Sequence, residues 1–65
     1  MRFIKLTEII SKKIGIKQER YFNVDKIETI ISADDCSFLI TNADTYRVKE
    51  TPEQIIELIK QAEEI

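Results

Sequence analysis

The residue types that most often carry out chemistry are scarce in this 65-residue chain, which has a single cysteine, Cys36, and no histidine. Nucleophilic catalysis needs a nucleophile beside a base, and the usual zinc sites need several nitrogen or sulfur ligands. Gly15 is the one glycine, so the sequence cannot supply a phosphate-binding glycine loop. We therefore predict that the protein is not an enzyme and has no catalytic, cofactor-binding or metal site.

Carboxylates are the remaining groups that could form a site. Asp34, Asp35 and Asp44 could gather near the ends of strands and hold a hard cation, but they do not have the spacing of a calcium-binding loop. Aspartate side chains also bond to nearby backbone amides in turns. We interpret all three as turn residues, and Cys36 as a small, partly buried apolar side chain.

The segment SKKIGIKQER, residues 11–20, places two isoleucines among four basic side chains. It joins two expected strands that two to five residues could connect. We predict a contact surface for another protein, with isoleucine anchors and steering cations. Two alternatives remain: the isoleucines fold back over the sheet, or the basic hairpin binds a small anionic ligand or single-stranded nucleic acid, with Phe3, Tyr21 and Phe22 as stacking rings. The candidate partner-binding residues are Lys12, Lys13, Ile14, Ile16, Lys17 and Arg20.

Charge is distributed unevenly along the chain. Residues 1–26 hold seven basic and three acidic side chains, whereas residues 27–65 hold three basic and nine acidic ones. This asymmetry suits self-assembly, internal pairing or an anionic partner. The total formal charge is −2, which argues against a nucleic-acid-binding domain because such domains have a strongly basic face.

Apolar alternation predicts an α+β fold in a single domain, residues 1–65. Residues 1–50 form an antiparallel β-meander of four to five strands, which could also curl toward a small barrel. In the last hairpin we expect Phe38 and Ile40 to face the same layer as Tyr46 and Val48. The expected strands are residues 2–10, 19–24, 26–33, 36–42 and 45–50.

Residues 51–65 form the C-terminal helix, which has the clearest boundary in the sequence. Thr51 is a favoured N-cap, Pro52 suits the first helical position, and Gln54 completes a capping box. We expect this helix to be a lid on one face of the sheet, with swapping onto a second copy as the alternative. Its apolar stripe is Ile55, Ile56, Leu58, Ile59, Ala62 and Ile65.

The expected strands carry apolar residues on both faces, as Ile30 and Ile31 illustrate, and one helix covers one face. A chain of this size also has a small core of its own. We therefore predict a homo-oligomer. The N-terminus lacks the apolar run of a secretory signal, and no run approaches the length of a membrane span. We expect a cytoplasmic protein.

The phrases FIKLTEI, FNVDKIETI and FLITNADTYRVKETPEQIIELI resemble the short FlbD/SwrD-like proteins of bacterial flagellar and swarming motility. The resemblance implies a strand hairpin and a VKE phrase leading into a final helix. This chain departs from that family in two turns, where SKKIGIKQER and NAD replace glycine-containing ones. The matching positions are Leu6, Thr7, Asn23, Asp25, Ile27, Ile30, Tyr46, Val48, Lys49, Glu50 and Ile55.

The function that we predict is binding to another protein, in a motility-related setting and as an oligomer. The first hairpin would supply the contact surface. One alternative is an inhibitor of a host system encoded by a phage or mobile element. The other is the small anionic ligand or single-stranded nucleic acid described above.

Overall fold

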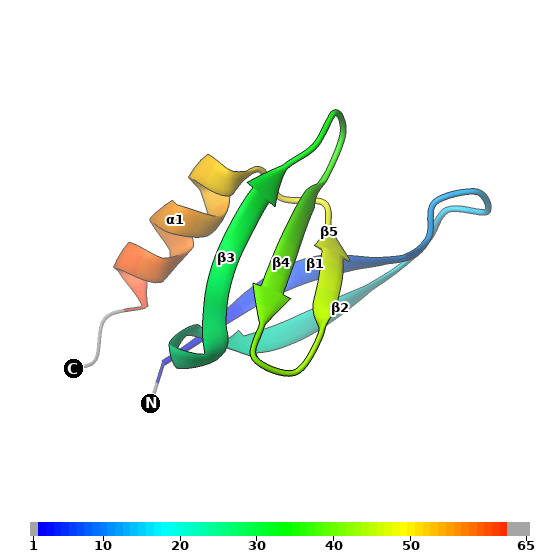
Figure 1. Ribbon diagram of the computed structural model, residues 1–65. Coiled ribbons are helices and arrows are strands. Elements are labelled where there is room, and N and C mark those ends of the chain that lie inside the picture. The colour runs from blue at the N-terminus through cyan, green and yellow to red at the C-terminus, as the bar shows by residue number, and fades with distance from the viewer. Residues whose placement is uncertain (1, 63–65) are drawn as a thin grey trace.

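A computed structural model, described here for residues 2–62, shows five strands in one antiparallel sheet followed by a single α-helix (Figure 1). This confirms the predicted α+β class and the C-terminal helix. A short 3₁₀ turn, Val24–Lys26, leads from the first hairpin into the rest of the sheet. The elements are β1 Phe3–Ser11, β2 Ile16–Asn23, β3 Ile27–Ser32, β4 Ser37–Thr41, β5 Thr45–Val48 and α1 Pro52–Gln61.

The strand order is β2-β1-β5-β4-β3, so the sheet combines a hairpin with a three-stranded meander. The last strand, β5, returns to pair with β1, where Glu8 lies opposite Val48. Strands β2 and β3 lie at the two edges, and the sheet therefore stays open and does not close into a barrel. This return of β5 to β1 joins the two parts of the molecule.

The β1–β2 hairpin is longer than the sequence suggested. Strand β2 begins at Ile16 and not at Glu19, so most of the expected connection is strand, and the turn itself occupies residues 12–15. Gly15 has a φ of +73°, a conformation that glycine adopts without steric cost. The position of the glycine thus sets where the hairpin turns.

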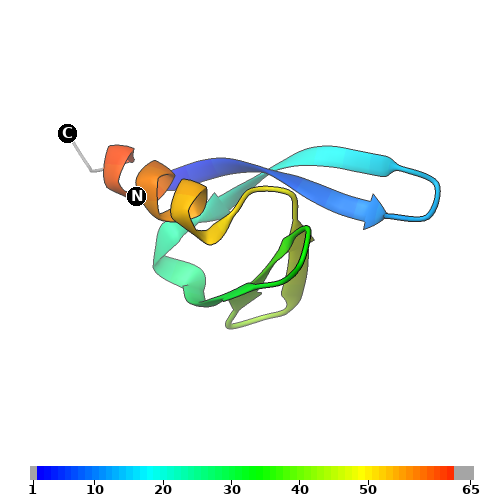
Figure 2. The ribbon, with the colours of Figure 1, turned by 90° about the horizontal axis from the view of Figure 1, so that it is seen from above.

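The core lies between the hairpin and the meander, with the helix at one end (Figure 2). The hairpin crosses above the meander and its turn extends well beyond it, so that the molecule measures 39 × 21 × 19 Å. Across this core the rings of Phe22 and Tyr46 pack edge to face, and their centroids are 5.1 Å apart. The buried apolar residues are Ile4, Leu6, Phe22, Val24, Leu39, Val48 and Ile55.

The register of the last hairpin differs from the predicted one by one residue. Leu39 lies opposite Tyr46 and faces the core, whereas Phe38 lies opposite Arg47 on the outer face. The turn sets this register, because the Thr41 backbone N–H donates to the Asp44 carbonyl (2.9 Å) and the Thr41 hydroxyl accepts from the Asp44 backbone N–H (3.1 Å). A shift of one residue exchanges the two faces of a strand, so the predicted face of Phe38 and Ile40 is wrong.

Helix α1 begins as predicted. The Thr51 hydroxyl accepts a hydrogen bond from the Gln54 backbone N–H, and the Gln54 side chain accepts one from the Thr51 backbone N–H. Ile55 is fully buried against the sheet of its own chain, so the helix is a lid here. Ile56 remains 47% exposed, and Ile65 of the expected stripe lies outside the described residues.

Candidate functional site

Five of the six candidate partner-binding residues lie together at the turn of the β1–β2 hairpin, which we call the hairpin tip (residues 12–17). Every residue of the tip is exposed, and Ile14 and Ile16 expose 70% and 46% of their surface. A side chain built at Gly15 would meet nothing within 4 Å. The isoleucines do not fold back over the sheet, so that alternative does not hold.

One lysine of the tip contacts the body of its own chain. Lys12 forms an ion pair with Asp35, which lies in the turn between β3 and β4. The hydrogen bond and the positive charge of Lys12 hold the pKa of the Asp35 carboxyl below its ordinary value. Both side chains remain more than half exposed, so this pair contributes little to stability but places the tip beside the β3–β4 turn.

Arg20, the sixth candidate, is not part of the tip. Its guanidinium donates a 3.0 Å hydrogen bond to the Glu8 carboxylate and lies 4.7 Å from the centre of the Tyr46 ring. The hydrogen bond to Glu8 raises the pKa of Arg20. This arginine thus joins β2, β1 and β5 and serves the fold of the hairpin base.

Glu8 is the acidic centre of the same cluster. Partial burial raises the pKa of its carboxyl, but hydrogen bonds from Gln18 and Arg20, together with the charge of Arg20, outweigh that effect and leave the pKa below its ordinary value. Its side chain is 13% exposed. An ionised Glu8 therefore fits the cluster better than a protonated one.

A second polar cluster, which we call the Glu50 clamp, connects β1 to the segment that follows β5. The Glu50 carboxylate accepts hydrogen bonds from the backbone N–H and the hydroxyl of Thr7, at 2.9 and 3.0 Å. The Lys49 backbone N–H donates to the Thr7 carbonyl, and the buried Ser37 hydroxyl donates to the Glu50 carbonyl. The LT and VKE phrases of the sequence thus meet here, a contact that sequence reasoning missed because 43 positions separate its partners.

The aromatic residues proposed as stacking rings do not form one platform. Phe22 is 5% exposed and belongs to the core, whereas Tyr21 and Phe3 are exposed by 67% and 49% on the opposite face of the hairpin. Successive residues of a strand point to opposite faces, which separates Tyr21 from Phe22. A platform of three rings for nucleic acid therefore does not exist on this surface.

The aspartates considered as cation ligands lie apart. Asp34 and Asp35 belong to the β3–β4 turn, whereas Asp44 precedes β5 at the other end of those strands, where its carboxylate accepts from the Thr45 backbone N–H. Within residues 2–62, no group of three or more histidine, cysteine, aspartate or glutamate side chains is placed to hold a metal ion. All three aspartates thus lie in turns, as expected.

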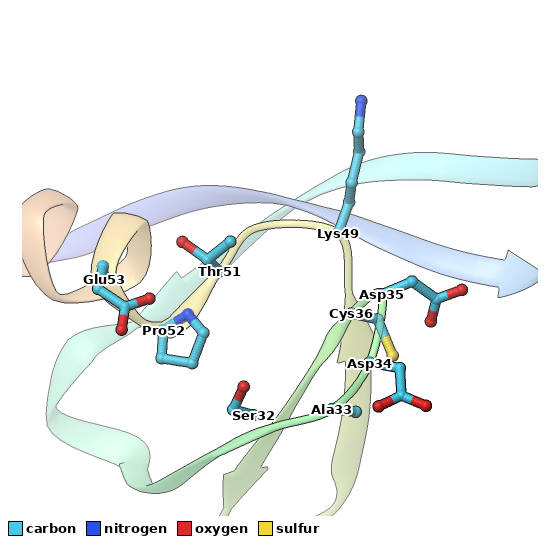
Figure 3. A pocket seen from close by; sticks show the side chains of 9 residues that line it. All are labelled: Ser32, Ala33, Asp34, Asp35, Cys36, Lys49, Thr51, Pro52 and Glu53. Atoms are coloured by element: carbon cyan, nitrogen blue, oxygen red, sulfur yellow. The ribbon is translucent and has the colours of Figure 1, made fainter.

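A pocket of about 300 Å³ lies between the β3–β4 turn and the start of α1; we call it the turn pocket (Figure 3). Asp34, Asp35 and Cys36 border it on one side and Pro52 and Glu53 on the other, while the Lys49 side chain extends away from it. Its lining also includes Ser32, Ala33 and Thr51. Sequence reasoning did not find this pocket, because strand pairing and not sequence proximity brings its two walls together.

These observations define a small α+β protein with an open five-stranded sheet, two polar clusters, an exposed hairpin tip and a pocket beside the β3–β4 turn that is partly lined by acidic residues. The chain matches the family FlbD, described as flagellar and swarming motility proteins, over residues 4–64, and it belongs to that family. The resemblance noted from the sequence is thereby confirmed, and the chain is a motility-related small protein. No curated protein and no solved structure matches it.

Several positions that matched this family in sequence have structural roles. The Asn23 side chain accepts a hydrogen bond from the Asp25 backbone N–H and so caps the 3₁₀ turn, and Asp25 pairs with Arg2 at 3.3 Å. Val48 and Ile55 are core residues, and Glu50 forms the clamp. Among the described residues, no helix is long and apolar enough to cross a membrane.

Proposed function

We propose that this protein acts by binding and not by catalysis, and that it serves motility by contacting another protein through the hairpin tip. It does so in the cytoplasm and as a homo-oligomer. The observation that carries this proposal is the exposure of Ile14 and Ile16 among Lys12, Lys13 and Lys17. The tip lies away from the core, so its apolar side chains are free for a partner.

The energetic argument rests on isoleucine burial. Covering one isoleucine side chain that is otherwise in water is worth about 1.5–3 kcal/mol. Two such anchors at the end of a defined hairpin supply a compact apolar centre, and the surrounding lysines increase the rate of encounter with an acidic partner. This arrangement matches the anatomy of a protein interface, which has an apolar centre and a charged rim.

The Glu8 cluster and the Glu50 clamp also support the proposal that the protein acts by binding. Gln18 and Arg20 each donate a hydrogen bond to the Glu8 carboxylate, and Thr7 donates to the Glu50 carboxylate. These groups fix the hairpin base to the body and so hold the tip in a defined position. A positioned and exposed surface is what a binding module requires.

Swarming assays test the proposal directly. In a strain that lacks the gene, we expect the wild-type protein to restore swarming and the double variant Ile14→Ser with Ile16→Ser to fail. Ile56→Ser is the matched control, since Ile56 is also a half-exposed isoleucine but lies on α1. All three proteins must accumulate to equal levels. Full swarming with the double variant would refute the proposal.

A further inference from the structure

The hairpin tip and the turn pocket are complementary in charge. The tip carries Lys12, Lys13 and Lys17, and the turn pocket has three acidic lining residues, Asp34, Asp35 and Glu53. Within the described part of the chain, Lys49 is its one basic lining residue, and the Lys49 side chain extends away from the pocket. The ion pair between Lys12 and Asp35 within one chain already joins the two surfaces at their margin. A basic surface and an acidic one on the same molecule fit a partner that has both, which is a second copy of this chain.

The two surfaces are also complementary in shape. The tip presents Ile14 as its most exposed apolar side chain, at 70%. The turn pocket, at about 300 Å³, lies at the lower end of the range for ligand pockets, and Ala33, Cys36 and Pro52 supply apolar atoms to its lining. The Ile14 side chain, flanked by the lysines of the tip, is small enough for this pocket and matches its apolar and acidic lining.

We propose that two copies form a symmetric dimer in which the hairpin tip of each copy docks on the turn pocket of the other. This inference rests on the proposed function, since it assigns to the tip a particular protein partner. Ile14 enters the pocket, and Lys13 faces Asp34 of the second copy. The dimer therefore buries apolar surface that a single chain leaves in water.

The position of the tip beside the pocket favours a closed dimer over an open chain of molecules. The Lys12–Asp35 pair shows that the two surfaces lie next to each other at the β3–β4 turn. A two-fold axis near that pair brings each tip over the opposite pocket, so both contacts form together. Contacts that repeat head to tail without such an axis would instead give fibres or rings.

A charge-swap experiment tests this arrangement. Sedimentation of the wild-type chain from about 1 µM to 1 mM gives its dimer dissociation constant. We expect Ile14→Ser, Lys13→Glu and Asp34→Lys each to raise that constant by about tenfold or more. An equimolar mixture of Lys13→Glu and Asp34→Lys then regains dimers, because each altered tip meets an altered pocket and each native tip meets a native pocket.

Two controls make the result decisive. Ile56→Ser and Lys26→Glu change an exposed isoleucine and an exposed lysine outside both surfaces, and we expect them to leave the dissociation constant unchanged. Thermal unfolding by circular dichroism verifies that every variant is folded. The charge-swapped pair is informative even if one variant is less stable, because lower stability alone does not restore a heterodimer.

Other outcomes overturn the inference. A wild-type chain that stays monomeric at about 1 mM has no such dimer. A dimer that is insensitive to Ile14→Ser and Asp34→Lys uses a different face. A monomer at about 1 mM also removes the homo-oligomer from the proposed function. Neither outcome refutes the contact role of the tip: if swarming still requires Ile14 and Ile16, the tip contacts a protein other than its own copy.

Discussion

The two ends of the β1–β2 hairpin contain the same type of residue in opposite environments. Ile4, at the base, is 3% exposed and lies opposite the buried Phe22. Ile14, at the tip, is 70% exposed. The hydrophobicity of the residues does not distinguish the two ends; what differs is whether another part of the chain covers the strand.

The boundary between the two ends lies near Glu8, where β5 crosses β1. Thr7 is held by the Glu50 clamp, Glu8 lies opposite Val48, and Arg20 ties the neighbouring strand to the same place. Before this point the inward side chains Ile4 and Leu6 of β1 are buried in the core, whereas beyond it Ile10 is 50% exposed. The length of strand β5 therefore determines how much of the hairpin contributes to stability and how much remains available for binding.

The largest effect that we expect is at the base. Ile4→Ser replaces a buried side chain with a polar one and leaves a cavity, at a cost of about 3–5 kcal/mol in the free energy of unfolding. A core of this size supplies roughly that much, so the variant should be largely unfolded by circular dichroism. Ile4→Val, with an expected loss of about 0.5–1.5 kcal/mol in urea denaturation, keeps the effect measurable. An Ile4→Ser variant with wild-type stability would show that the base is not the core.

The Glu50 clamp should have the next largest effect. Glu50→Ala leaves the Thr7 backbone N–H and hydroxyl without their charged acceptor, and we expect a loss of about 1.5–3 kcal/mol in the free energy of unfolding. Urea denaturation measures it. Glu28→Ala removes an exposed carboxylate from β3 and serves as the control, with an expected change within about 0.5 kcal/mol. Equal losses in both variants would mean that the clamp does not fasten β1.

The Glu8 cluster makes a smaller contribution that depends on pH. The pKa of Glu8 is lower in the folded state than in the unfolded chain, so its stabilising effect is present above the ordinary value of 4.5 and is lost as the pH falls through the folded pKa. Glu8→Gln should reduce the free energy of unfolding by about 1 kcal/mol at pH 7. Urea denaturation at pH 7 and below pH 4.5 tests this, since the difference from wild type should shrink in acid. A difference that is constant with pH would contradict the assignment.

The sequence predicted most where the determining interactions are local. The start of α1 follows from Thr51, Pro52 and Gln54, which lie within four positions. The turn at Gly15 was not predicted, because the sequence suggested a longer connection and a second strand that begins at Glu19 and not at Ile16. The helix start was confirmed because cap chemistry involves few residues. The exposure of the tip itself was one of several alternatives, and the structure was needed to choose among them.

Contacts between distant residues were not predictable in the same way. Pairing of β5 with β1, the Glu50 clamp and the turn pocket all join segments far apart in the chain. The register of β4 and β5 depends on the hydrogen bonds of one turn, and an error of one residue placed Phe38 on the wrong face. Arg20 was grouped with the other basic residues of the segment SKKIGIKQER because it is near them in sequence, but strand β2 places it at the hairpin base, away from the tip.

The smallest expected effect on stability is at the tip, and it sharpens the contrast with Ile4. Ile14→Ser should change the free energy of unfolding of the monomer by less than about 0.5 kcal/mol, since Ile14 leaves most of its surface in water. Urea denaturation at low protein concentration, where dimers do not contribute, measures this change in the free energy of unfolding. Identical substitutions at positions 4 and 14 would then separate the two roles, with loss of the fold at the base and loss of binding alone at the tip. A destabilisation of about 2 kcal/mol or more by Ile14→Ser would instead place the tip against the body of the chain and remove it as a contact surface.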